Sequence, residues 1–206
     1  MPAPSTGSSV TASPGSPTPT ARASTAASLA ALSTKLPSTP LRTAVLAGGY
    51  RLREPGQGEP LVIAASGPVL SEVLDAAAGL EDEGVAATVI DVTSLDRLFR
   101  GWKGTLADAA RHAEPATSAG HLEMLLTPSK RTAPIVTVHD AASHSMAWLG
   151  SVFGQRVVPV GVDSFGESGT IEELYDVFGL LPAQMVNAAL VGLSRRRSAP
   201  AAVRSR

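Results

Sequence analysis

Apolar residues in this chain come in short continuous runs separated by polar or glycine-rich segments. Four runs stand out, at residues 61–65, 85–92, 135–138 and 157–162. Runs of this length with no polar alternation are typical of strands buried on both faces of a parallel sheet. Because parallel strands need crossover connections and cover on both faces, the remaining chain is expected to supply helices.

The stretch 134–170 organises the predicted fold. It contains the third and fourth apolar runs with a short apolar helix between them, and each run ends in a polar or glycine-rich turn. Earlier in the chain, Ser66-Gly67-Pro68 ends the first run. Apolar residues then recur at helical spacing up to Leu80, and Gly84 follows as a C-terminal cap. The segment 61–92 therefore predicts a right-handed strand–helix–strand unit.

Helices are also expected elsewhere in the chain. The pattern predicts an irregular helix within 93–104, a helix near 106–112, a surface loop at 114–120 and a short helix at 121–126. Thr170 and Glu173 have the spacing of a capping box, which predicts a helix ending at Gly179. A last helix is expected over 182–193.

Composition narrows the function classes. The chain has 206 residues, a formal net charge of −1 and no cysteine. Near-neutral charge gives no support to a general nucleic-acid or membrane-surface role. The absence of cysteine excludes disulfides and thiolate metal sites. No apolar run reaches the ~18 residues needed to span a membrane.

Four segments are expected along the chain. Residues 1–40 form a Ser/Thr/Ala/Pro-rich leader that is predicted to be disordered, residues 41–60 an approach segment, residues 61–193 the folded domain, and residues 194–206 a basic disordered tail. The leader lacks acidic residues, as transit peptides do, but a plain linker or unstructured leader is the preferred interpretation. We expect a cytoplasmic location, with organelle targeting left open.

The candidate chemistry lies at the predicted carboxyl ends of strands, where open parallel sheets bind ligands. His139, Asp140, Ser143 and His144 follow the third run, and His139, Asp140 and His144 are candidate catalytic residues. The competing interpretation is that Asp140 or Ser143 caps a helix while the histidines fix the turn. The two histidines are five residues apart, a poor spacing for a shared metal, so no metal site is predicted.

Two further groups are weaker candidates. The glycine-rich turn before Thr170 could hold an anion through Gly166, Ser168, Gly169 and Thr170, although it lacks a P-loop lysine and Glu167 would repel phosphate. Trp148 and Phe153 flank the apolar helix. They are either core residues or contacts to a second subunit.

Two segments taken together resemble a known family. The first is Ala65-Ser66-Gly67 with Glu72-Val73, and the second is Gly-Val-Asp-Ser-Phe-Gly-Glu-Ser-Gly-Thr at 161–170. Together they are similar to the C-terminal domain of the transketolase family. The closest likeness is to the single-chain decarboxylating first component of pyruvate dehydrogenase and its transketolase-like relatives, and it covers about residues 45–193. The resemblance implies an α/β fold, a three-layer α/β/α sandwich with a mostly parallel sheet of about five strands.

The resemblance also implies what this chain lacks. In the family, thiamine diphosphate and magnesium are bound by two other domains, one of which carries a Gly-Asp-Gly motif that does not occur here. We therefore expect no cofactor on this chain alone, and an assembly role in a homodimer or with a partner subunit that carries the thiamine-binding domains. The alternatives are a nonfunctional fragment of such an enzyme, or a free-standing anion-binding protein or enzyme that uses the His139/Asp140 turn.

Overall fold

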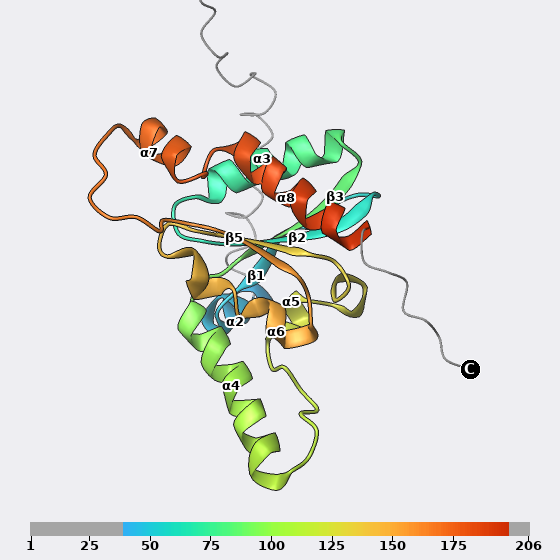
Figure 1. Ribbon diagram of the computed structural model, residues 1–206. Helices are drawn as coiled ribbons and strands as arrows, with labels where there is room; N and C mark the ends of the chain where they lie inside the picture. Colours follow the sequence, from blue (N-terminus) through green and yellow to red (C-terminus); the bar gives the residue numbers. More distant parts are fainter. Residues whose placement is uncertain (1–38, 198–206) are drawn as a thin grey trace, which may run out of the picture.

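The computed structural model describes residues 39–197, which form a sheet covered on both faces by helices (Figure 1). The sheet has five strands in the order β1-β3-β2-β4-β5. Strands β2, β3, β4 and β5 are parallel, and β1 pairs antiparallel with β3 at one edge. The strands are β1 (Tyr50–Arg53), β2 (Glu59–Ser66), β3 (Val85–Asp91), β4 (Ile135–His139) and β5 (Val157–Val160).

The helices make two layers, one on each face of the sheet. Figure 1 shows α3, α7 and α8 on one side and α2, α4, α5 and α6 on the other. Their bounds are α2 (Thr39–Ala47), α3 (Leu70–Asp82), α4 (Leu95–His112), α5 (Leu122–Leu125), α6 (Leu149–Phe153), α7 (Ile171–Val177) and α8 (Pro182–Arg197). Two short 3₁₀ helices, η1 (Pro128–Lys130) and η2 (Ser143–Met146), flank β4. The predicted three-layer α/β/α sandwich with a mostly parallel sheet is confirmed.

Each face of the sheet has its own apolar core. Along β2, Leu61 and Ile63 point towards α3 and α8, where Leu80 and Met185 are also buried. The intervening Val62 belongs to the other core. Alternate residues of one strand thus serve opposite cores. The second core also includes Leu98, Leu122, Leu125, Leu126, Ile135, Met146 and Leu149.

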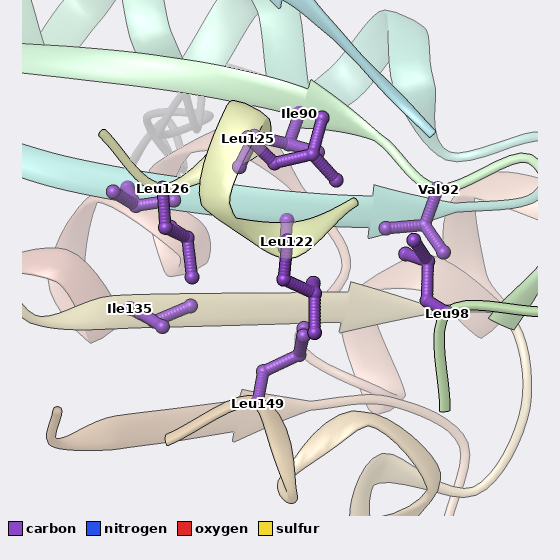
Figure 2. A pocket seen from close by; sticks show the side chains of 10 residues that line it. Ile90, Val92, Leu98, Leu122, Leu125, Leu126, Ile135 and Leu149 are labelled. Atoms are coloured by element: carbon purple, nitrogen blue, oxygen red, sulfur yellow. The ribbon is translucent and has the colours of Figure 1, made fainter. Parts of the chain in front are cut away.

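The second core encloses a small apolar cavity of about 10 Å³ (Figure 2). Leu122 and Leu125 of α5 reach into it from one side, and Ile135 of β4 and Leu149 of α6 border it. Such a space is about one water molecule in size, but its lining is apolar and offers no hydrogen bonds to hold water.

The segment 41–60, predicted as an approach segment, is part of the folded domain. Helix α2 occupies its first part, and β1 then adds a fifth strand to the sheet. The register of β1 shifts between Arg51 and Arg53. A four-residue edge strand with polar residues has almost no apolar signal, which explains why the pattern did not predict it.

The segment 93–112 also differs from the expected two pieces. It is one continuous helix, α4, in which the side chain of Ser94 accepts a hydrogen bond from the Arg97 amide. Gly101 and Gly104 lie inside this helix, and packing of Leu98 and Trp102 against the second core overrides their low helix propensity. The helix ends at Ala113, whose φ of 53° is left-handed.

Most other elements lie where the pattern placed them. The capping box at Thr170 and Glu173 is present. The short helix expected at 121–126 is α5, and the last helix begins at Pro182 and continues to Arg197. The predicted leader at 1–40 and tail at 194–206 fall largely outside the described residues.

One segment, Ile171–Ser194, is long and apolar enough to cross a membrane by composition alone. In the fold it is two helices, α7 and α8, which are separate between Val177 and Pro182. The inner face of α8 is buried against the sheet through Met185, Ala189 and Leu193. The apolar character of the segment is therefore explained by core packing.

Candidate functional site

Three polar turns meet at the carboxyl edge of the sheet. Strands β2, β4 and β5 are parallel neighbours, so the turns that follow them lie side by side. They contribute Ser66 and Gly67, His139 and Asp140, and the segment that begins at Gly161. The topology brings the sequence-predicted residues to the place where open parallel sheets bind ligands.

Asp140 packs directly against the turn after β2. Gly67 has a φ of +94°, and a Cβ built on it would collide with the Asp140 carboxylate. Glycine is needed there both for its backbone conformation and for the close approach of that carboxylate. On its other side, Asp140 lies 3.6 Å from Nε2 of His139.

The turns after β4 and β5 are held together by a carboxylate. Oδ1 of Asp163 accepts a hydrogen bond of 2.8 Å from the Ser143 amide, and Oδ2 accepts one of 2.7 Å from the Ser143 hydroxyl. These two hydrogen bonds are the main cause that lowers the pKa of Asp163, with a smaller contribution from His144. Ser143 therefore helps to fix the turn after β4, and its partner is Asp163 in the turn after β5.

His139 is held by a serine whose proton is committed elsewhere. Ser145 Oγ donates to the carbonyl of Ala142 at 2.7 Å, and Nδ1 of His139 lies 2.9 Å from the same oxygen. A hydroxyl has one proton to donate, so Nδ1 of His139 must carry the proton of the second hydrogen bond. His139 therefore cannot act as the base that activates Ser145, and a Ser–His–Asp hydrolytic set is not assembled at this turn.

His144 does not share a ligand set with His139. It lies on η2 and is exposed, and no group of three or more His, Cys, Asp or Glu side chains is arranged for a metal within residues 39–197.

The glycine-rich turn after β5 leads into α7. Both donors of Thr170 are engaged within the helix: its amide and its hydroxyl bond Oε2 of Glu173, at 2.8 and 3.0 Å. These bonds lower the pKa of Glu173. Of the four candidate anion-binding residues, Gly166, Ser168 and Gly169 remain exposed on the turn, whereas Thr170 already serves a carboxylate.

Tyr175 extends the site onto α7. Burial is the main cause that raises the pKa of its hydroxyl, and the negative charges of Glu72 and Asp140 raise it further. Tyr175 also packs against the first core. The Tyr175 hydroxyl therefore lies close enough to the Asp140 turn to be affected by that carboxylate, and its neutral form is favoured.

The aromatic candidates occupy the opposite face. Trp148 stacks on Trp102 of α4 with ring centroids 5.3 Å apart, and Phe99 meets its edge at 5.2 Å. Trp148 is half-buried, so it joins α4 to the second core at its margin. Phe153 is also half-buried, and the Arg131 guanidinium lies 4.1 Å from its ring centre.

Two polar sites were not predicted from sequence. Tyr50 at the start of β1 hydrogen bonds Asp91 at the end of β3, and burial is the main cause that raises the pKa of both groups. At the other end of the sheet, a cleft of about 430 Å³ is bordered by an ion pair between Lys130 and Glu54, with atoms 2.8 Å apart. The two residues of each pair are far apart in the sequence, so no local sequence pattern predicts that they meet. An acidic residue ending a buried strand, as Asp91 does, was the one available hint.

Comparison with known proteins agrees with this architecture. Residues 48–181 match the family of transketolase-like TK C-terminal domains. The plasmid transketolase of Cupriavidus necator is 31% identical over 150 residues, which are 73% of this chain and 19% of that protein. Because the family match spans well over half of the chain, this chain belongs to the transketolase-like C-terminal domain family.

Solved structures show the same fold. A Leishmania mexicana transketolase matches 77% of this chain with a TM-score of 0.52 and 23% identity, over 20% of its own length. A Pichia stipitis transketolase matches 75% of this chain with a TM-score of 0.54 and 19% identity, over 19% of its length. The chain thus spans about a fifth of the length of the transketolases that it matches.

Proposed function

We propose that this chain is the assembly domain of a thiamine-diphosphate-dependent, transketolase-type enzyme. In this role it packs against a second copy or against a partner subunit that carries the thiamine-binding domains. Family membership supports this class of enzyme, and the small share of the relatives' length that the chain covers supports the view that the chemistry lies in other domains. We also propose a cytoplasmic location.

One observation carries the proposal: the segment after β5 exposes apolar side chains that a folded domain normally buries. Phe165 is fully exposed, Ile171 is 73% exposed and Val177 is 64% exposed. All three lie within residues 161–177, the segment that follows the carboxyl end of β5. Exposed apolar side chains gathered in one region are typical of protein interfaces.

We propose that the cofactor binds to the partner. The described residues do not fit a magnesium–diphosphate site, because they offer no cluster of three acidic or histidine ligands, and the Ser143 amide at the start of η2 already donates to Asp163. The alternative of a free-standing enzyme is weakened by the hydrogen bonding of Ser145, which leaves His139 without a nucleophile to activate.

The test is purification of the full chain from its source cell. We expect it to elute in a complex, with a thiamine-dependent partner identified by mass spectrometry or with a second copy. Elution as a single copy with no partner would overturn the assembly role. A calorimetric signal with thiamine diphosphate or a phosphorylated sugar in that same single-copy sample would instead establish the free-standing alternative. A nonfunctional fragment would give neither a complex nor heat.

A further inference from the structure

We propose that the cleft at the amino edge of the sheet binds a small organic monocarboxylate, with the carboxylate group of the ligand on Lys130 and its apolar body against the cleft wall. This cleft lies beside the first residues of β2 and β3, whereas the segment 161–177 follows the carboxyl end of β5. The inference is therefore independent of the proposed assembly function, and either can fail without the other.

The cleft has the size and the lining of a small-molecule site. Its volume is about 430 Å³. Ligand pockets are typically about 300–1,000 Å³ and mostly apolar, with a few polar groups that fix the orientation of the ligand. The polar lining here includes Thr88 and Lys130. The apolar lining, which would contact the body of the ligand, consists of Pro55, Pro60, Leu61, Ala86 and Ala133.

Both walls of the cleft are held in place by the fold. One wall is the loop 54–58, and it packs so closely on the start of β3 that a Cβ built on Gly58 would lie 2.6 Å from the carbonyl oxygen of Gly84. The other wall is η1, where the side-chain amide of Gln155 donates to the carbonyl of Lys130 at 2.9 Å. A preformed cleft lowers the cost of ordering side chains and loops when a ligand binds.

Lys130 provides the anchor for an anion. Its side chain is only 16% exposed, and its Nζ lies 2.8 Å from Oε2 of Glu54. An ammonium group has three N–H donors, and this ion pair engages one of them. A largely buried charge needs further hydrogen-bond partners. A carboxylate in the cleft would supply them.

The charges around Lys130 favour a ligand with a single negative charge. Oε1 of Glu54 also pairs with Nε of Arg51, at 2.7 Å. Two cations thus share one carboxylate, which leaves this cluster with one positive charge in excess. A monocarboxylate balances that charge. A phosphate dianion would leave an excess of negative charge next to Glu54.

Thr88 supplies a second donor from another element. It lies on β3 and is only 2% exposed, yet it lines the cleft. A threonine hydroxyl can donate one hydrogen bond, and each carboxylate oxygen can accept more than one. Because Lys130 comes from η1 and Thr88 from the sheet, a carboxylate held by both is oriented as well as bound.

The first experiment is a titration of the full-length chain, followed through its amide NMR spectrum. The probes are benzoate, benzamide, which has the same ring without the charge, and inorganic phosphate. We expect millimolar benzoate to shift the amide signals of Gln57, Gly58, Ser129 and Lys130 to saturation, and the other two probes to bind at least about tenfold more weakly. The absence of a saturable shift with benzoate, or equal binding of benzamide or phosphate, would overturn the proposal.

Substitutions then test the anchor. Lys130→Met should weaken benzoate binding by about tenfold or more, because the ligand loses its charge-assisted hydrogen bond. Thr88→Val keeps the shape of the side chain and should weaken binding by about threefold, because only a hydroxyl is lost. Lys103→Met is the matched control, since Lys103 is an exposed lysine on α4, beside Phe99, and outside the cleft lining.

The amide spectrum of each variant also reports whether it is folded. Thr88→Val carries the test by itself if Lys130→Met does not fold. The site is rejected if Thr88→Val binds benzoate as well as the unchanged chain does, or if Lys130→Met weakens binding no more than Lys103→Met.

Discussion

At the scale of single residues, the turn after β2 depends on a position where only glycine fits. Gly67 has a left-handed φ and faces the Asp140 carboxylate, whereas Gly84, after α3, has a similar φ of +75° but open space around its Cβ position. The pair separates the cost of backbone conformation from the cost of steric conflict.

We expect Gly67→Ala to destabilise the domain more than Gly84→Ala. Both substitutions place a side chain in the left-handed region, at about 1–3 kcal/mol. Only Gly67→Ala must also displace Asp140 from the turn. Urea unfolding of the two variants measures the difference. Equal losses would show that Asp140 moves freely and does not depend on the glycine.

Asp163 makes stability depend on pH in a defined direction. Its pKa is lowered in the folded chain, chiefly by the two hydrogen bonds from Ser143. The stabilisation is therefore present above the unfolded pKa of about 3.9 and is lost as pH falls through the lower folded pKa. We expect Asp163→Asn to unfold more easily than wild type at pH 7, and the gap to narrow towards pH 3. Urea midpoints at the two pH values measure the gap, and a constant gap would contradict this role.

At the scale of elements, α4 is joined to the rest of the fold by aromatic contacts at its first half. Leu98 is buried, while Trp102 stacks on Trp148 with an interplanar angle of 19°. The remaining turns extend away from the sheet (Figure 1). The stacked pair therefore sets how firmly α4 is anchored to the connection between β4 and β5.

A double-mutant cycle measures that anchor. Each of Trp102→Ala and Trp148→Ala should lower the free energy of unfolding by about 2 kcal/mol, less than for a fully buried tryptophan, because both rings are half-buried. The double variant should lose about 0.5–1.5 kcal/mol less than the sum, which is the value of a stacked aromatic pair. Additive losses would mean that the rings do not stabilise each other in solution.

The elements that could be predicted from sequence are those with a strong local signal. The four parallel strands are continuous apolar runs, and the capping box at Thr170 is a four-residue pattern. Strand β1 and the continuity of α4 were missed because tertiary packing, not local composition, decides them. The turn that contains His139 follows a strand, as predicted. The hydrogen bonds of His139 to Ser145 and of Ser143 to Asp163 depend on how the turns fold against each other, which the spacing of residues along the chain does not reveal.

At the scale of the whole molecule, one sheet serves two cores. Leu122 fills the core on the α5 side and Met185 fills the core on the α8 side, and each is almost fully buried. Because alternate residues of the same strands line both cores, loss of packing on one face weakens the sheet for the other. The two halves should not unfold separately.

We expect Leu122→Ala and Met185→Ala each to cost about 2–5 kcal/mol and to leave a single cooperative transition. Leu122→Ala also enlarges the existing cavity and should fall in the upper part of that range. Met124→Ala, on the same helix as Leu122 but 66% exposed, should stay within about 0.5 kcal/mol. Fluorescence and circular dichroism melts that fail to coincide would show that the two cores are independent.

The irregular strand β1 has a consequence for how far association can proceed. A sheet with two equally receptive edges could add copies without limit and grow into a fibre. Here the β1 edge is short, shifts register, and carries Arg51 and Arg53, which are features that discourage strand addition. The opposite edge strand, β5, carries Pro159, which has no amide proton to donate to an added strand. Both edges of the sheet are therefore protected against the open-ended strand addition that leads to fibres.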